Sequence, residues 1–222
     1  MTLATNRSAR KNRPTKVEFN VVLKLLKKHY PDAHCALNFS NPYELLVATV
    51  LSAQCTDERV NKVTPALFAR FPDARALKKA ETAEIEELIR STGFYKNKAK
   101  NLKACAEQLV AAHGGEIPKD MESLCALPGV GRKTANVVLG NAFKISSGVV
   151  VDTHVTRLSN RFGWVKGQDA VKIEQVLNKL CPVQDWIMLS HYLIAHGRTL
   201  CTARSPKCST CFINEACPKR GI

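Results

Sequence analysis

Apolar residues recur with helical spacing along most of the chain. Residues three and four positions apart lie side by side on a helix, so an apolar stripe at that spacing marks the buried face. The first such stripe comprises Val21, Val22, Leu25, Leu26 and Tyr30. The same spacing predicts further helices over 85–89, 95–110, 120–125, 132–141, 170–180 and 185–197. The paired glycines at 114–115 are expected to end the longest of them.

A helix-start pattern precedes the most apolar segment. Asn41 is expected to cap a helix, Pro42 to occupy its first turn and Glu44 to reach back to the cap. Residues 45–51 are apolar on every side, which predicts a central buried helix. Only 149–151 could form a short extended piece, and nothing alternates around it. The pattern therefore predicts an all-α fold.

Basic residues give the chain a strong positive charge. Its 222 residues, 45% of them hydrophobic, suffice for one large domain or two small ones. The net charge is +14, and removing the five basic residues of 1–16 still leaves +9. A basic globular body favours a polyanionic partner, most simply nucleic acid. The alternatives are a protein kept soluble by its charge or one that contacts anionic lipid.

The chain lacks the patterns of export and membrane insertion. Its longest apolar run, around 45–53, is far shorter than the roughly 20 residues that span a bilayer. Residues 1–16 are basic but carry no apolar stretch of a secretory signal, so we expect a disordered basic tail. An organelle-targeting segment is the alternative, because the tail has no acid. The short tail favours a bacterial or archaeal cytoplasm.

A glycine-containing turn separates two predicted helices. Residues 127–133 read Leu-Pro-Gly-Val-Gly-Arg-Lys, with Gly129, Val130 and Gly131 in the turn and Arg132 opening the second helix. Both glycines are expected to adopt positive φ and to let backbone N–H groups approach a partner. Together with the helix N-terminus, this arrangement suits a DNA phosphate bound without sequence reading. An ordinary turn between helices is the alternative.

Lys133 and Asp152 are candidates for covalent chemistry on a sugar. A lysine amine can form a Schiff base with a sugar C1′, provided that desolvation or nearby positive charge lowers its usual pKa of about 10.4. Asp152 follows nineteen positions later and could stabilise a cationic sugar while a base departs. Alternatively, Lys133 only contacts a phosphate and Asp152 only caps the helix that begins at Thr153.

The cysteines point to a metal centre. There are nine, and without an export pattern disulfides are a poor explanation. Cys201, Cys208, Cys211 and Cys217 have the spacing C-x6-C-x2-C-x5-C, which can enclose one metal site. Zinc is the generic possibility, although structural zinc sites more often show two close cysteine pairs. Most of the other five cysteines are expected to be small buried apolar residues.

Together, 127–139, 151–155 and the terminal cysteines resemble the endonuclease III family, the bifunctional DNA glycosylases of the helix–hairpin–helix superfamily. The resemblance runs from about residue 37 to Cys217. It implies two α-helical domains flanking a DNA-binding cleft, with a C-terminal iron–sulfur cluster loop. The expected division is a tail over 1–16, a six-helix domain with the helix–hairpin–helix over 35–145, and an iron–sulfur domain from 17–34 plus 146–222.

The resemblance also assigns the chemistry. Lys133 matches the family's nucleophile and Asp152 its catalytic carboxylate, and the four cysteines match its 4Fe–4S ligands. The lysine argues against adenine–mismatch relatives, which lack it and remove a base without cutting the strand.

The resemblance implies DNA contacts as well. Gln54, in the loop 51–57, matches the residue that fills the gap left by a flipped base. Phe94, in 92–95, stands in a second wedge loop where the family commonly has leucine. Gly129, Val130, Gly131 and Arg132 would hold phosphates, and Arg204 and Lys207 could contact others.

The predicted protein is a DNA N-glycosylase with AP lyase activity. It is expected to excise oxidised or damaged pyrimidines through a lysine Schiff base and to cleave the strand by β-elimination. Its expected partner is double-stranded DNA containing damaged bases or abasic sites, and we expect a monomer with no membrane contact. Two alternatives are a monofunctional glycosylase of the same superfamily and a non-catalytic iron–sulfur DNA-binding protein.

Overall fold

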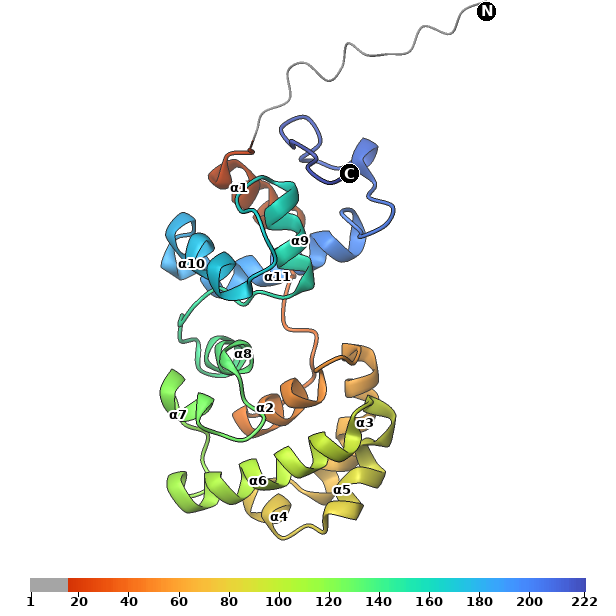
Figure 1. The fold of residues 1–222 in the computed structure, drawn as a ribbon, viewed down its shortest axis with the longest axis vertical. Helices are drawn as coiled ribbons and strands as arrows, with labels where there is room; N and C mark the ends of the chain where they lie inside the picture. The colour runs from red at the N-terminus through yellow and green to blue at the C-terminus, as the bar shows by residue number, and fades with distance from the viewer. Residues whose placement is uncertain (1–15) are drawn as a thin grey trace, which may run out of the picture. The chain divides into compact units, whose positions relative to one another are not determined.

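The computed structural model describes residues 16–222, which form helices joined by short loops (Figure 1). This range contains no β-strand, so the prediction of an all-α fold is confirmed. The predicted basic tail, apart from Lys16, lies outside the described residues. The α-helices are α1 (Phe19–His29), α2 (Pro42–Leu51), α3 (Asp57–Arg70), α4 (Ala74–Lys78), α5 (Thr82–Ile89), α6 (Tyr95–His113), α7 (Met121–Cys125), α8 (Arg132–Phe143), α9 (Thr153–Arg161), α10 (Ala170–Leu180) and α11 (Trp186–Thr199). Three short 3-10 helices are η2 (Arg90–Thr92), η3 (Val183–Asp185) and η4 (Cys208–Thr210).

The chain divides into two compact units. One comprises the chain up to His34 together with Gly148–Ile222, and the other comprises Cys35–Ser147. Each unit has its own apolar core. The Cys35–Ser147 unit holds seven α-helices, α2–α8, where six were expected. Among the seven is α4, a helix of only five residues that is too short to show a periodic apolar stripe.

Helix α2 lies at the centre of the Cys35–Ser147 core. Asn41 accepts a hydrogen bond from the Glu44 N–H (3.0 Å), and the Glu44 carboxylate accepts one from the Ser40 N–H (2.6 Å). Eight of the ten helix residues are buried, including Leu45, Leu46 and Leu51. The predicted cap and the predicted burial are therefore both confirmed. The Glu44 carboxylate, however, binds the N–H of Ser40, the residue before the cap, and not that of Asn41.

Helix α3 is absent from the elements predicted above, although its sequence carries helical spacing. Thr56 caps it by accepting from the Arg59 N–H at 3.2 Å, and Val60, Val63 and Leu67 are buried on one face. Pro65 lies inside the helix, where a proline normally disfavours helix continuation. The buried face outweighs that local preference.

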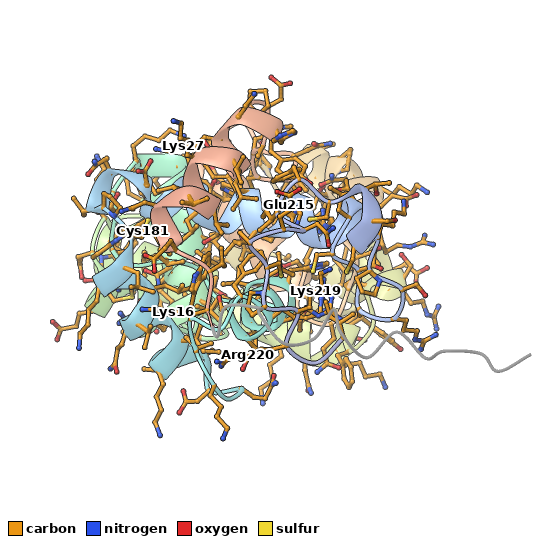
Figure 2. The ribbon with its side chains drawn as sticks, turned by 90° about the horizontal axis from the view of Figure 1, so that it is seen from above. Lys16, Lys27, Cys181, Glu215, Lys219 and Arg220 are labelled. Carbon is orange, nitrogen blue, oxygen red and sulfur yellow. The ribbon has the colours of Figure 1, made fainter. Side chains whose placement is uncertain are left out.

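The other unit packs α1, α9, α10 and α11 around residues such as Leu26, Phe162 and Leu193. Val17 anchors the start of the described chain, because its N–H donates to the Phe162 carbonyl (3.0 Å) and its carbonyl accepts from the Trp164 indole (2.9 Å). Lys27 of α1 pairs with Asp185 at 2.6 Å; Figure 2 labels Lys27. No helix within residues 16–222 is long and apolar enough to cross a membrane.

Candidate functional site

A tight turn joins α7 to α8. Asp120 caps α7 by accepting from the Ser123 N–H (2.8 Å), and the Val130 N–H closes the turn by donating to the Leu127 carbonyl (3.1 Å). Gly129 has a φ of 77°, whereas Gly131 has a φ of −94° and an extended conformation as the N-cap of α8. The expectation of positive φ is therefore right for Gly129 and wrong for Gly131, because an N-cap residue ordinarily has β-region dihedrals.

The two turn glycines have different surroundings. A Cβ on Gly129 would lie 2.9 Å from the Asn101 Cβ of α6, so this glycine is needed for packing as well as for its left-handed backbone. A Cβ on Gly131 would meet nothing within 4 Å. No side chain caps α8. The hairpin therefore presents an uncapped helix N-terminus next to a glycine that packs against nothing in the protein.

Arg132 and Lys133 occupy the first turn of α8, and both are exposed. The same helix is anchored by buried Ala135, Val138 and Leu139. Val130, predicted as a DNA contact, is only 6% exposed and belongs to the apolar core of its unit. Lys133 is thus a solvent-accessible amine on a helix whose opposite face is fixed in the core, at the positive end of the helix dipole.

Asp152 lies in the other unit and caps α9. Its Oδ1 accepts a hydrogen bond from the Val155 N–H at 2.8 Å, and the residue is half-buried. The capping role considered from the sequence is therefore present. His154 packs beside it against α11, since a Cβ on Gly197 would lie 2.7 Å from the His154 Nδ1. Burial lowers the pKa of His154, and the Arg157 Nη2 lies 3.2 Å from its Nδ1.

The two predicted wedge residues share an unusual backbone. Gln54, after α2, has a φ of 53°, and Phe94, after η2, has a φ of 49°. Both are exposed, and Phe94 keeps 64% of its surface open to solvent. Left-handed backbone at a residue other than glycine costs on the order of 1 kcal/mol and needs support from its surroundings. Each loop therefore presents a strained, exposed tip.

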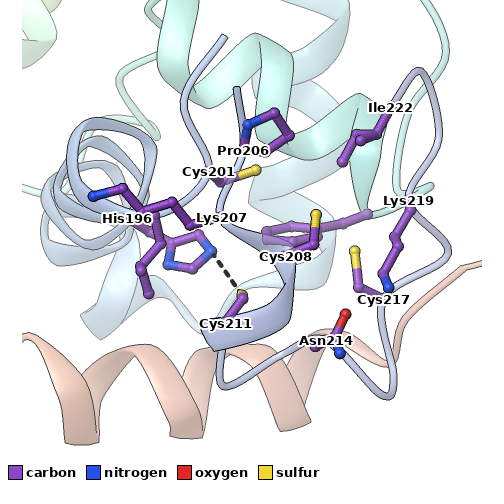
Figure 3. Close-up of a pocket in the computed structure, with 12 residues that line it drawn as sticks. His196, Cys201, Pro206, Lys207, Cys208, Cys211, Asn214, Cys217, Lys219 and Ile222 are labelled. Atoms are coloured by element: carbon purple, nitrogen blue, oxygen red, sulfur yellow. Dashed lines mark hydrogen bonds between the residues drawn. The ribbon is translucent and has the colours of Figure 1, made fainter. Parts of the chain in front are cut away.

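The four terminal cysteines line one cavity in the unit that contains Gly148–Ile222 (Figure 3). It has about 290 Å³ of empty space, part of it open to solvent, and Phe162, Leu200 and Pro206 complete its apolar wall. None of the nine cysteines forms a disulfide. The segment is folded by its own backbone: the Cys201 N–H donates to the His196 carbonyl (2.8 Å), and the Cys217 N–H to the Ile213 carbonyl (2.9 Å).

The donor arrangement distinguishes a cluster from a single ion. Tetrahedral zinc with bonds of about 2.3 Å needs sulfur atoms roughly 3.8 Å apart. Within residues 16–222, no three cysteine, histidine or acidic side chains converge closely enough to hold one ion. Four sulfurs placed around a cavity instead suit a group of several metal atoms. The four cysteines that line this cavity fit an iron–sulfur cluster.

Two buried polar side chains support the cysteines, and neither was predicted from the sequence. Arg161 is 6% exposed and donates to the Cys201 Sγ (3.3 Å), the Thr202 carbonyl (2.7 Å) and the Ala203 carbonyl (2.9 Å). His196 is fully buried, with its Nε2 3.6 Å from the Cys211 Sγ and its Nδ1 3.0 Å from the Tyr30 hydroxyl. Burial lowers the pKa of His196 to about 4, so its ring is neutral at pH 7.

The same burial acts on the thiols. Burial raises the pKa of Cys211 and of Cys217 above the ordinary range. Iron binding must displace these thiol protons, so the affinity falls as the pH falls. Arg204 and Lys207 are exposed in the loop between the first two cysteines, and Lys207 also borders the cavity.

Comparison with known proteins gives matches across both units. A family model described as HhH-GPD superfamily base excision DNA repair protein matches residues 47–183, and one for the iron–sulfur binding domain of endonuclease III matches residues 201–217. Endonuclease III of Synechocystis sp. is 56% identical over 197 residues, covering 89% of this chain and 90% of that protein. Endonuclease III of Escherichia coli K12 is 40% identical over 196 residues, covering 88% and 92%. A trapped endonuclease III–DNA covalent intermediate has a TM-score of 0.86 and 43% identity over 89% of this chain and 93% of that one.

The glycine pair gives a matched test of the turn. Gly129→Ala is expected to destabilise the protein by at least about 1–2 kcal/mol, because it combines left-handed backbone strain with a 2.9 Å contact to the Asn101 Cβ. Gly131→Ala should cost less, about 0.5–1 kcal/mol, since its Cβ enters open space and only the poorer N-cap preference of alanine counts against it. Urea unfolding of both variants measures this difference, and equal losses would contradict it.

Arg161→Met tests the support of the cysteine loop. The change leaves the buried Cys201 sulfur and two half-buried carbonyls without their donor, so we expect a loss of at least about 2 kcal/mol in stability and less iron per chain. Arg204→Met, at an exposed position of the same loop, is the control and should change neither. Thermal unfolding and iron analysis provide the readouts. Full iron content in Arg161→Met would count against this role.

Proposed function

The chain belongs to the endonuclease III family of HhH-GPD base excision DNA repair proteins, and we propose that Lys133 and Asp152 carry its chemistry. Its activity is that of a DNA glycosylase with AP lyase activity. The observation that supports Lys133 most directly is its position: an exposed amine on the second residue of α8, beside Arg132 and at the uncapped helix N-terminus.

In the proposed reaction, the Lys133 Nζ attacks the sugar C1′ as the bond from C1′ to the base breaks. The departing base takes the bonding electron pair and a proton. Loss of the amine proton and opening of the sugar ring give a Schiff base between Nζ and C1′. Removal of a C2′ proton then expels the 3′ phosphate by β-elimination, which cuts the strand. Water finally releases Lys133 from the sugar fragment.

Asp152 is proposed to stabilise positive charge on the sugar during base departure and to move protons. Its cap to the Val155 N–H uses Oδ1 and fixes the carboxylate at the start of α9. Capping and catalysis are compatible, because one hydrogen bond to a carboxylate leaves it further acceptor capacity. The cap would thus orient the same group that acts on the sugar.

The hairpin is proposed to bind a DNA phosphate through the backbone of Gly129, Val130 and Gly131, with Arg132 adding charge. The uncapped start of α8 and the open space beside Gly131 support this role. Such contacts position DNA without reading its sequence. Gln54 and Phe94 are proposed to enter the duplex from their exposed tips, and Arg204 and Lys207 to contact phosphates elsewhere.

The partner is DNA, and we propose that its reactive form is a duplex carrying damaged pyrimidines or abasic sites, bound by one copy of the chain. Named relatives have been solved on DNA, one as a covalent intermediate. We further propose that the protein works in a bacterial or archaeal cytoplasm, as its bacterial relatives suggest.

The cofactor of this family is a 4Fe–4S cluster, and we propose that Cys201, Cys208, Cys211 and Cys217 would hold it. When bound, the cluster supplies a covalent cross-link among four points of the terminal segment. Arg161 places a positive charge beside Cys201 (3.3 Å), which complements the negative thiolates. The chain's own contribution here is to fold the loop and to keep the cysteines partly shielded from water.

Trapping with borohydride tests the role of Lys133. On a duplex with one thymine glycol, the wild type should form a reduced covalent adduct, and Lys133→Gln should form none because it has no amine to condense with C1′. Lys172→Gln, whose lysine side chain is 82% exposed on α10, is the control and should trap like the wild type. Base release by the wild type without any adduct would instead favour a monofunctional glycosylase, with Lys133 as a phosphate contact.

Asp152→Asn separates capping from catalysis. Asparagine caps helices about as well as aspartate, so the melting temperature should change little. Loss of the negative charge should lower the single-turnover rate of base excision by at least about a hundredfold, the size typical of a lost electrostatic or acid–base group. A variant that keeps the wild-type rate would reduce Asp152 to a helix cap.

A further inference from the structure

A buried lysine joins the two loops that carry Gln54 and Phe94. Lys98, in the first turn of α6, is only 6% exposed. Its Nζ donates to the Leu51 carbonyl and to the Thr92 carbonyl, each at 2.8 Å. Burial lowers the pKa of this amine. A lysine side chain is almost never this buried without polar partners, and its partners here are two backbone carbonyls from separate segments.

The positions of these two carbonyls are informative. Leu51 ends α2, and the loop that follows reaches its left-handed residue at Gln54. Thr92 ends η2, and the chain then passes through Gly93 to the left-handed Phe94. Lys98 therefore binds the carbonyl of the last helical residue that precedes each exposed tip. It ties together two segments about forty residues apart in sequence at the point where each leaves the core.

Besides the two bonds from Lys98, each loop contains short-range hydrogen bonds of its own. The Ser52 hydroxyl donates to the Thr49 carbonyl (2.8 Å), and the Cys55 N–H donates to the Ser52 carbonyl (3.1 Å). The Thr92 hydroxyl donates to the Ile89 carbonyl (2.8 Å). These bonds shape each loop separately. The Lys98 amine, in contrast, sets one loop relative to the other.

We propose that Lys98 is a positioning residue that holds the tips at Gln54 and Phe94 in one fixed arrangement, so that both enter a damaged duplex together. This inference rests on the proposed function, in which these two residues act as wedges. Because Lys98 fixes the backbone at the base of each loop, both tips already hold their strained left-handed conformation before DNA binds. A preorganised pair loses less entropy on binding than two independently mobile loops.

The experiment uses Lys98→Met in the full-length, cluster-containing protein, since methionine fills similar space without donating to either carbonyl. The DNA is a duplex with a stable abasic-site analogue. The fluorescent base 2-aminopurine is placed either opposite the analogue or beside it, and its emission rises when it is unstacked. Affinity for the same duplex without the lesion gives the non-specific baseline, measured at one fixed salt concentration.

In Lys98→Met, the ratio of the affinity for the lesion duplex to that for the undamaged duplex should fall by at least about tenfold. Two hydrogen bonds from a charged donor are lost, and a loss of this size is expected from them. Binding to the undamaged duplex should stay within about twofold of the wild type. The fluorescence rise should fall at both probe positions. Gln54→Ala and Phe94→Ala should each lower it mainly at one position, because each removes one tip and leaves the other in place.

Lys103→Met is the matched control. Lys103 lies on the same helix and its Nζ also donates to a backbone carbonyl, that of Ala80 at 2.7 Å. This carbonyl lies outside both wedge loops. The control therefore shares the loss of a lysine–carbonyl bond, here a half-buried one, and it should keep the lesion preference and both fluorescence signals. An equal loss in both variants would show general destabilisation and would overturn the proposal.

The remaining outcomes separate this inference from the function on which it rests. If the single-tip variants lose their signals while Lys98→Met keeps both, the wedges stand and the role of Lys98 is overturned. If neither tip variant changes the lesion preference, the wedge assignment itself fails, and the inference with it. Should Lys98→Met fail to fold, Lys98→Gln, which retains an amide donor, replaces it. The expected result is then a smaller loss at both probe positions, and no loss overturns the proposal.

Discussion

Burial of α2 is the constraint on which the Cys35–Ser147 unit depends. Its apolar residues leave no face for water, so other helices must pack around it, and α8, which carries Lys133, is one of them. The last carbonyl of α2, from Leu51, is also held by Lys98, where the loop to Gln54 begins. A single buried helix thus fixes both the platform of the proposed nucleophile and the base of a proposed wedge. A core of this kind has few alternative packings, which suits residues that must meet DNA in a set geometry.

The functional side chains follow a common plan. Each is exposed or half-exposed, yet sits at the end of an element whose other residues are buried. Lys133 opens α8 above buried Ala135 and Val138, and Asp152 caps α9 above buried Val155 and Leu158. The terminal loop follows the reverse arrangement: its charged support, Arg161, is buried, whereas Arg204 and Lys207 of the loop are exposed. Lys133 and Asp152 are therefore held rigidly by the apolar cores beneath them. The terminal loop is held by polar contacts and by the cluster.

Local patterns in the sequence predicted much of this structure. The Asn41 cap, the turn at Gly129 and the set of four cysteines each depend on residues close together in the chain, and each is present. The backbone of Gly131 was predicted wrongly, because a glycine between two helices can serve either a left-handed turn or an extended N-cap. Arg161, His196 and Lys98 escaped prediction for a different reason. Their partners lie far away in sequence, and a lone arginine, histidine or lysine in a helical pattern looks like an ordinary surface residue.

The central claim is that the amine of Lys133 forms the covalent bond to DNA. Proteolysis of the borohydride-reduced complex, followed by mass spectrometry, identifies the modified residue directly. The predicted result is a sugar fragment attached to Nζ in the peptide that contains Lys133, with the other lysines of the chain unmodified. Attachment to a different lysine, or to the chain's N-terminal amine, would contradict the claim. Lys133, at the start of α8, would then be a phosphate contact only.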